Sequence, residues 1–456
     1  MTIIYSARWV LPISSPAIPD GAIAIDGSQI VEVGTRASLI KNYPDPRERQ
    51  FPNAVILPGL INSHSHLELT AMRGFLEDSE SDFASWLRKL TVARLTLFTS
   101  DDLHVSALWG AVEALRAGVT AVADASDSAS ESMKALKDIG MRGVVFQESF
   151  GPDPKLADEN LVKLKTKIAQ LTELQTSLVK VGVSPHAPYT VSGRQLELIS
   201  DFALTDGLPV MMHAAESKAE EMLLQEGRGL FAEGLAQRGI EWKTPGMSSV
   251  QYLRSHGVLQ TKPLLAHCIR VNEADIEALR ESGARVAHCP KSNTKLGHGR
   301  APFPRLLERG VPVGLGSDSV ASNNTCDILE EARFAALLAR SETESSSGKG
   351  MVSSADVTHA ATIGGAQALG LENHAGELRT GLQADFAVIA IDQPHQLPLY
   401  DPIDTLVFAS SGRNVILTVV AGKELFSEGR VTTVDEERLA ARINEIAVKL
   451  GAAHME

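Results

Sequence analysis

Histidines and carboxylates occur where short apolar runs of this sequence end. The stretch LPGLINSHSHLELT, residues 57–70, places His64 and His66 one residue apart. Alternate residues of a strand point to the same face, so the two imidazoles could bind one ion. The same pair could equally be two ordinary polar residues at the start of a loop. His213, in MMHAAES, and Asp318, in GLGSDS, end two later runs.

These four side chains form a set that suits a divalent first-row metal. Three imidazoles and one carboxylate bind Zn²⁺, with Fe or Mn as alternatives, and leave a position for water. Such an ion lowers the pKa of its water toward neutrality. A second metal would need a bridging group, such as a modified lysine on the fourth strand, but that strand ends in SPHAPY. The sequence therefore predicts one divalent metal, with zinc as the first choice.

Three further side chains near strand ends are candidates for the reaction. Glu216 follows His213 by three residues and could move protons beside the metal. The alternative is a surface glutamate that opens the next helix. His267, in LLAHCIR, could polarise an attacking water or a developing oxyanion, or could be a buried structural histidine. His298, in KLGHGRAP, is a candidate for substrate contact.

The elements that must position these residues alternate along the middle of the chain. Eight near-continuous apolar runs, as expected of parallel strands buried on both faces, are separated by helix-like segments. One such segment, 101–118, begins with aspartates, spaces its apolar residues by three and four, and ends at a glycine. Eight βα units predict a (β/α)8 TIM-like barrel, an α/β fold with its catalytic rim at the strand ends. The polar residues at those ends are His64, His66, Asp124, Glu148, His186, His213, His267, His288 and Asp318.

The two ends of the chain differ from the middle. Residues 1–57 contain short β-like pieces with an Asp-Gly turn, and residues 378–456 repeat this character before a terminal helix. Neither end has enough apolar surface for a core of its own. We therefore predict one small β-sandwich built from both ends, beside a catalytic barrel of residues 58–377. The serine-rich patch at 341–350 is predicted to be a mobile loop.

Composition excludes several classes of partner. The chain has 456 residues, 44% of them hydrophobic, and a formal charge of −13, which argues against a nucleic-acid backbone as ligand. No run approaches the ~18 uncharged apolar residues of a membrane span, and no signal-peptide pattern is found. Three widely spaced cysteines indicate a reducing compartment without a disulfide framework. We expect a soluble cytoplasmic protein that binds a small heterocyclic molecule and neither nucleic acid nor membrane.

Six motifs together resemble the amidohydrolase superfamily, in the branch of nucleoside deaminases and triazine hydrolases. They are PGLINSHSHLE, SPHAPYT, HAAES, LAHC, VAHCPKSNTKLGHG and GLGSDSVASNN, and they follow the family's order over nearly the whole chain. The resemblance implies a metal-ligand set of His64, His66, His213 and Asp318. It also implies that Glu216 shuttles protons, that His267 contacts the water at the metal, and that Asp318 takes a proton from it. A homodimer is a further expectation from the family.

The resemblance also implies which residues meet the substrate. Trp86, in DFASWLRKL, matches a tryptophan that packs against the substrate in nucleoside deaminases. His186 would face a ring or hydroxyl of the substrate. HSHLELTAMRGF, WLRKLT and FQESFG are similar to segments of aminodeoxyfutalosine deaminases, which makes Glu68 and Ser149 candidates for substrate contact. The polar residues of HCPKSN that would supply further hydrogen bonds are Ser292 and Asn293.

Three functions stay open. The first is hydrolytic deamination of an adenine-type nucleoside, which Glu216 favours because an amine leaves with a proton whereas chloride does not. S-adenosylhomocysteine and methylthioadenosine deaminases carry a proline and a glutamate soon after the tryptophan, but this chain reads WLRKLTVARLT. Aminodeoxyfutalosine, of the menaquinone pathway, is therefore the favoured substrate, with adenosine and those two nucleosides as alternatives.

The second function is hydrolysis of another heterocycle, such as a chlorotriazine or a cyclic amide. The third is a non-enzymatic scaffold of the same fold, against which the complete ligand set counts. A different class of zinc deaminase is excluded, because its signature, an H-x-E together with a C-x-x-C, does not occur in the sequence.

Overall fold

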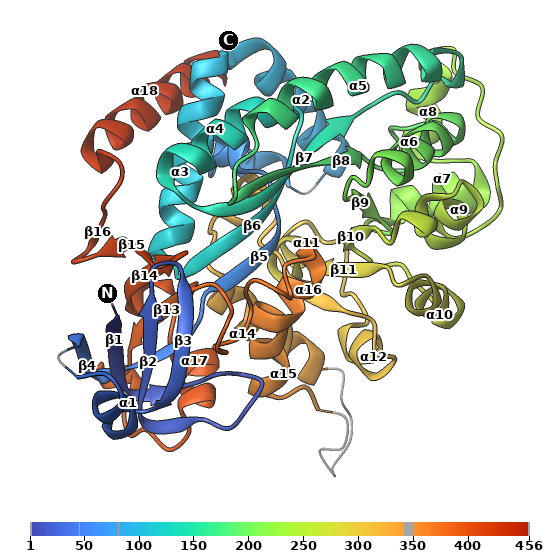
Figure 1. Ribbon diagram of the computed structural model, residues 1–456. Coiled ribbons are helices and arrows are strands. Elements are labelled where there is room, and N and C mark those ends of the chain that lie inside the picture. Colours follow the sequence, from blue (N-terminus) through green and yellow to red (C-terminus); the bar gives the residue numbers. More distant parts are fainter. Residues whose placement is uncertain (1, 45, 81, 342–350, 455–456) are drawn as a thin grey trace.

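The computed structural model describes residues 2–44, 46–80, 82–341 and 351–454 (Figure 1). Most of the serine-rich patch, for which a mobile loop was predicted, lies outside these ranges. Within them the chain has mixed α/β content, with three sheets surrounded by helices.

Strands from both ends of the chain share one eight-stranded sheet, in the order β16-β15-β14-β13-β4-β1-β2-β3 (Figure 1). The N-terminal strands are β1 (Ile3–Val10), β2 (Ile18–Asp26), β3 (Gln29–Thr35) and β4 (Arg47–Pro58). The C-terminal strands are β13 (Phe386–Ala390), β14 (Val415–Val420), β15 (Lys423–Ser427) and β16 (Arg430–Val431). β4 joins the two groups, because it runs parallel to β1 and antiparallel to β13.

Side chains from distant parts of the sequence hold this sheet together and attach it to the rest of the molecule. The rings of Tyr5 and Phe386 meet edge to face with centroids 4.9 Å apart in the core of the sheet. Arg142 forms a two-pronged ion pair with Asp385 at 2.6 and 3.2 Å, and both side chains are almost fully buried. Asp385 also accepts a hydrogen bond from the backbone N–H of Ala421.

Two four-stranded parallel sheets form the centre of the molecule. The first has the order β5 (Leu60–Ser65), β6 (Val119–Ser126), β7 (Arg142–Ser149) and β8 (Val179–Pro185). The second consists of β9 (Met211–Ala214), β10 (Leu264–His267), β11 (Arg285–His288) and β12 (Val313–Leu315). Isolated parallel bridges join them at both seams, between Ser65 and Asp318 and between Val183 and Val210. Each of the eight predicted apolar runs contains one of these strands.

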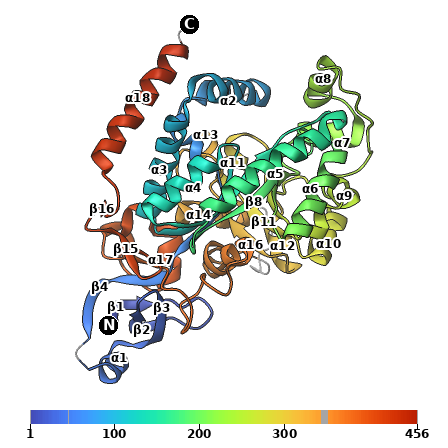
Figure 2. The ribbon, with the colours of Figure 1, turned by 45° about the horizontal axis from the view of Figure 1, so that its top comes forward.

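Helices follow the central strands in sequence and cover their outer side (Figures 1 and 2). After β5 to β8 come α2 (Phe83–Leu97), α3 (Ser100–Arg116), α4 (Ala129–Ile139), α5 (Ala157–Leu174) and α6 (Gly193–Asp206). After β9 and β10 come α7 (Lys218–Glu226), α8 (Leu230–Gln237), α9 (Ser249–Ser255) and α10 (Glu273–Ser282). After β11 and β12 come α11 (Pro290–Lys295), α12 (Phe303–Glu308), α13 (Val320–Asn323), α14 (Ile328–Arg340), α15 (Ser354–His359) and α16 (Gly365–Leu369). The end sheet adds α1 (Arg36–Asn42) and α17 (Pro402–Ala409).

The predicted helix at 101–118 corresponds to α3. A capping box, in which Thr99 and Asp102 exchange hydrogen bonds, begins it one residue earlier than predicted. The terminal helix α18 (Glu436–His454) packs against α3 and α2 (Figure 2). Its Ile446 and Leu450 belong to the same apolar cluster as Trp86. Within the described ranges, no helix is both long enough and apolar enough to cross a membrane.

Candidate active site

Four side chains predicted as metal ligands converge at the carboxyl ends of the central strands. His64 Nε2 lies 3.3 Å and His66 Nε2 3.6 Å from Asp318 Oδ1, and His66 Nε2 lies 3.1 Å from His213 Nε2. In a tetrahedral site with bonds of ~2.1 Å, neighbouring ligand atoms are roughly 3.4 Å apart. The observed separations therefore match the spacing that one divalent ion requires.

The hydrogen bonds of these histidines leave lone pairs free for a metal. His213 Nδ1 lies 2.8 Å from the carbonyl oxygen of His186, which can only accept, so Nδ1 carries the hydrogen and Nε2 a lone pair. The ring of His64 is fully buried, and among the described residues neither of its nitrogens has a hydrogen-bond partner. Burial lowers the pKa of His66 to about 3, so that imidazole is neutral at pH 7. Neutral imidazoles with unpartnered nitrogens fit a metal site.

Buried polar groups fasten the ligand-bearing loops. Asp124, at the end of β6, accepts hydrogen bonds from the backbone N–H of Leu67 at 2.7 Å and from the hydroxyl of Ser65 at 3.1 Å. Asp318 Oδ2 accepts from the hydroxyls of Ser292 and Ser322 at 2.7 and 3.0 Å, which leaves Oδ1 directed at the histidines. These hydrogen bonds fix the positions of the side chains that were predicted as metal ligands.

Two residues of the site have backbone conformations that L residues rarely adopt. His267 has a φ of 73° and Asp318 a φ of 58°. Such left-handed conformations cost about 1–3 kcal/mol each and persist where the surrounding structure enforces them. At Asp318 the enforcing contact is the hydrogen bond from its N–H to the carbonyl of His64, 2.9 Å long. These left-handed backbone conformations place the side chains of His267 and Asp318 in the cluster.

Glu216 lies beside the ligand cluster, between two imidazoles. Its Oε1 is 3.8 Å from His267 Nε2 and 3.7 Å from His298 Nε2. Burial raises the pKa of Glu216 to about 7. The backbone N–H of Glu216 donates to the buried carboxylate of Glu220, which fixes the start of this loop. His267 Nδ1 lies 2.9 Å from Asn293 Oδ1, so its Nε2 faces the carboxyl groups. Although burial opposes it, the carboxylates of Glu216 and Asp318 raise the pKa of His267.

A cavity of about 430 Å³ opens onto this cluster. One face of α2 forms much of its wall, with Trp86 buried and stacked on Phe83. His186 and Tyr189 line the opposite side. Much of the wall is apolar, and the residues that make it so, on α2 and elsewhere, are Leu69, Leu87, Leu90, Leu95, Phe150 and Leu296. Five carboxylates also line the cavity, namely Glu68, Asp127, Glu148, Glu216 and Asp318.

Three of the predicted substrate contacts do not line this cavity. Ser149 accepts a hydrogen bond from Gln195 at 3.0 Å, because its side chain leaves β7 on the face opposite to that of Glu148. Ser292 bonds to Asp318, and Asn293 bonds to His267. The structure thus corrects all three to residues that support their neighbours.

Glu68 does line the cavity, but its carboxylate is already engaged. It accepts from Arg94 Nε at 2.9 Å, from the hydroxyl of Ser126 and from the backbone N–H of Ser128 at 3.1 Å. Trp86 and His186, for which contact with the substrate was predicted, both line the cavity. His298 packs edge-on against Phe83, with centroids 4.6 Å apart, and faces Glu216.

Several residues of the cavity were not predicted from the sequence. Glu148 was placed at a strand end but was given no role, because alternation along β7 puts it and Ser149 on opposite faces without identifying the face of the cavity. Tyr189 follows His186 in the SPHAPY segment, which was the available signal. Phe83 and Arg94 share a face of α2 with Trp86, at helical spacing.

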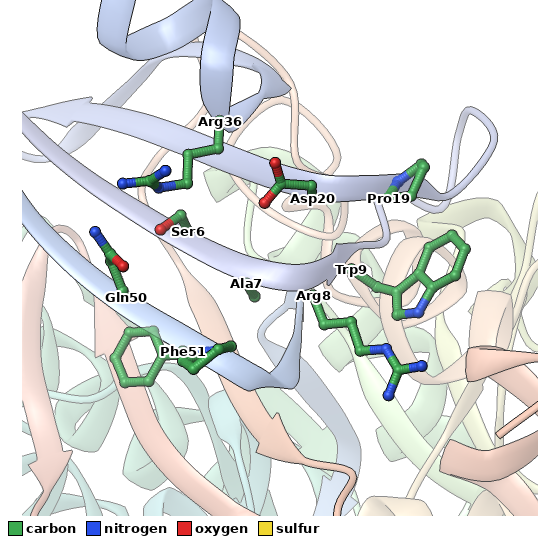
Figure 3. Close-up of a pocket in the computed structure, with 10 residues that line it drawn as sticks. Ser6, Ala7, Arg8, Trp9, Pro19, Asp20, Arg36, Gln50 and Phe51 are labelled. Carbon is green, nitrogen blue, oxygen red and sulfur yellow. The ribbon is translucent and has the colours of Figure 1, made fainter. Parts of the chain in front are cut away.

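Two other features could be mistaken for sites. Glu148, His186 and His213 also form a group with metal-ligand spacing, but it shares His213, whose one free nitrogen already faces His66. The group is therefore not an independent second metal site. A separate hollow of about 400 Å³ lies on the end sheet, where Figure 3 shows Arg36 and Gln50 along its wall. It holds no histidine, and Arg36 is paired with a glutamate of β4.

Comparison with known proteins places this geometry in a family. The profile of the amidohydrolase family matches residues 55–425. The chain is 32% identical over 453 residues to 5′-deoxyadenosine deaminase of Methanosarcina mazei, covering 99% of this chain and 98% of the relative. It is 33% identical over 447 residues to 5-methylthioadenosine/S-adenosylhomocysteine deaminase of Pyrococcus furiosus, covering 96% of each. The chain belongs to the amidohydrolase family.

Solved structures agree with this assignment. A zinc-bound adenosine deaminase from Xanthomonas campestris superimposes with a TM-score of 0.88 at 25% identity, covering 99% of this chain and 98% of that one. A zinc complex of atrazine chlorohydrolase from Arthrobacter aurescens gives a TM-score of 0.84 at 25% identity, covering 98% and 100%. The predicted family is confirmed by the family match, and both of these neighbouring structures hold zinc.

Proposed function

We propose that this protein is a metal-dependent hydrolytic deaminase, which replaces the 6-amino group of an adenine nucleoside with oxygen and releases ammonia. The observation that carries the proposal is the buried carboxyl of Glu216, with its pKa raised by burial to about 7, beside a complete set of metal ligands. The deaminase names of the relatives support the same reaction.

In this proposal the ligands are His64, His66, His213 and Asp318, holding one ion, with zinc first and iron or manganese as alternatives. When bound, the ion supplies Lewis acidity and lowers the pKa of a water molecule toward neutrality. The unpartnered nitrogens of His64 and the free Nε2 of His213 support this set.

Side chains of the protein would transfer the two protons of the attacking water. Water gives its oxygen to C6 of the purine, and its two hydrogens end on the ring nitrogen and on the departing ammonia. Asp318 and His267 would accept a proton from the water, and Glu216 would deliver protons to the ring nitrogen and the amine. A carboxyl with a pKa near 7 suits this proton transfer, because it can be both protonated and deprotonated at neutral pH. Trp86 and the apolar wall would exclude water and hold the purine.

The same proposal extends to architecture. A closed (β/α)8 barrel over residues 58–377 is supported by the parallel bridges at both seams between the central sheets. A β-sandwich of residues 1–57 and 378–456 is supported by the sheet that the two ends share. A homodimer and a cytoplasmic location stay predictions, the first tested by light scattering of the purified protein.

The function is tested by incubating zinc-loaded protein with a panel of nucleosides. The panel contains adenosine, 5′-deoxyadenosine, methylthioadenosine, S-adenosylhomocysteine and aminodeoxyfutalosine, followed by ammonia release and by the adenine-to-hypoxanthine absorbance change. The segment after Trp86 disfavours methylthioadenosine and S-adenosylhomocysteine. They are included because one relative is named a deaminase of these two nucleosides, and 5′-deoxyadenosine because another is named its deaminase. Turnover of at least one nucleoside is expected. No ammonia from any of them, with metal bound, would overturn the proposal and favour a chlorotriazine or a cyclic amide.

A further inference from the structure

Glu148 is a buried carboxyl group at the wall of the cavity. Only 7% of the residue is exposed, and it lines the cavity from the end of β7. Its Oε1 is fully buried and, in the part of the chain that the structure describes, has no hydrogen-bond partner. His186 Nε2 lies 4.0 Å from this oxygen, beyond hydrogen-bond distance. A buried polar group without a hydrogen bond destabilises the folded protein, so its presence at a binding cavity indicates that a ligand completes it.

The other carboxylates of the cavity are already committed. Glu68 and Asp127 share Arg94, at 2.9 and 3.1 Å. Glu216 and Asp318 belong to the reaction centre proposed above. Of the five carboxylates that line the cavity, Glu148 is therefore the one available to bind a part of the substrate away from the reacting carbon.

Helix α2, which forms much of the cavity wall, offers no carboxylate to bind a sugar hydroxyl. The residues that α2 contributes to the cavity are Phe83, Trp86, Leu87, Leu90, Thr91, Arg94 and Leu95, and none of them is acidic. Arg94 is held by two carboxylates and is not available as a free cation. The nucleosides proposed above differ at the 5′ carbon and share hydroxyl groups on the sugar, which is the polar edge that remains once the purine faces Glu216.

We propose that Glu148 is a specificity-determining residue that hydrogen-bonds the sugar hydroxyls of the substrate, an inference that rests on the proposed deaminase function. Burial, together with the neighbouring carboxylate of Glu68, raises the pKa of Glu148 well above its ordinary value. A protonated carboxyl both donates and accepts, as a hydroxyl does, so the two groups are complementary. The apolar wall beyond it is left for the 5′ substituent.

The test compares 5′-deoxyadenosine with 2′,5′-dideoxyadenosine and 3′,5′-dideoxyadenosine on the zinc-loaded protein. We expect kcat/KM of the wild type to fall by about 10- to 100-fold when the recognised hydroxyl is removed, because the buried carboxyl is again left unpaired. In Glu148→Ala the kcat/KM values for 5′-deoxyadenosine and for the dideoxy substrates should differ by no more than about 3-fold, because the value for 5′-deoxyadenosine falls. Glu148→Gln preserves the shape of the residue and should give an intermediate ratio, which keeps the test available where the alanine variant does not fold.

Ser149→Ala is the matched control, because Ser149 is the next residue on β7 and bonds to Gln195 outside the cavity. It should keep the wild-type ratio. A wild type that does not discriminate, or a Glu148→Ala variant that discriminates as strongly as the wild type, would overturn the inference alone. So would loss of zinc from a folded Glu148 variant, since that would make the residue a ligand. A wild type inactive on every aminopurine would instead overturn the proposed function.

Discussion

The Glu216→Gln substitution should slow the loss of an amine far more than the loss of a chloride. Glu216 Oε1 lies within 4 Å of His267 and His298, and burial raises its pKa to about 7. Near neutral pH the carboxyl can therefore both accept and donate a proton, whereas glutamine keeps the shape and cannot exchange one. General acid–base catalysis contributes about 10²- to 10⁴-fold, so we expect kcat/KM for the best aminopurine nucleoside to fall by that factor.

A matched substrate isolates the proton that the amine requires. Chloride leaves without a proton, so hydrolysis of 6-chloropurine riboside needs Glu216 at the ring nitrogen alone and should fall by a smaller factor than the aminopurine in the same variant. Both reactions are followed by ultraviolet absorbance on one zinc-loaded preparation, with zinc content and melting temperature compared with those of the wild type. An equal loss on both substrates would refute a role of Glu216 in protonating the amine, because it would assign the residue to the ring nitrogen, to activation of water or to the shape of the cavity.

The other predictions concern stability, the metal and the support of His267. Asp385→Ala should lower the free energy of unfolding, measured by chemical denaturation, by about 3–5 kcal/mol, because it leaves the Arg142 guanidinium buried without its partner. Chelation of the metal should abolish turnover and lower the melting temperature measured by calorimetry, since an ion at 1,000 times its Kd stabilises the folded state by about 4 kcal/mol. Asn293→Ala should lower kcat by about 10- to 100-fold with little change in KM, measured by steady-state kinetics, because His267 loses the acceptor that orients its ring.

Each of these has a control within the chain. Removing Arg142 together with Asp385 should destabilise the protein less than Asp385→Ala does, because no charge is left unpaired. Added zinc should restore the chelated enzyme, and turnover by fully metal-free protein would contradict the proposed site. Asn293→Asp keeps an acceptor for His267 Nδ1 and should retain more activity than Asn293→Ala. Equal activity of those two variants would count against an orienting hydrogen bond.

The strand ends that carry the chemistry could be predicted from the sequence. Strands buried on both faces leave continuous apolar runs, and each of the eight runs contains a strand. Because parallel strands present their carboxyl ends at one edge, polar residues there meet even when far apart in sequence. His64, His66, His213 and Asp318 were expected together on this ground, and their ligand atoms lie 3.1 to 3.6 Å apart from one to the next.

The orientation of single side chains could not be predicted in the same way. Glu148 and Ser149 are neighbours on β7, and a strand buried on both faces has no polar alternation to show which of them faces the cavity. Ser292 and Asn293 lie on α11, a short helix whose direction depends on its packing. The order of the end sheet also has no local signal, since β4 lies between β1 and β13.

The central place of β4 in the end sheet determines when this protein can finish folding during its synthesis. Ala54–Pro58 pair with Phe386–Ala390, roughly 330 residues later in the chain. A ribosome adding about 5–20 residues per second needs roughly 15–65 s to cover that distance. Throughout that interval one edge of β4 has no strand beside it, and an unpaired apolar edge favours aggregation. Chains that end before residue 386 should therefore accumulate as insoluble protein, whereas a chain released at full length can close its own edge.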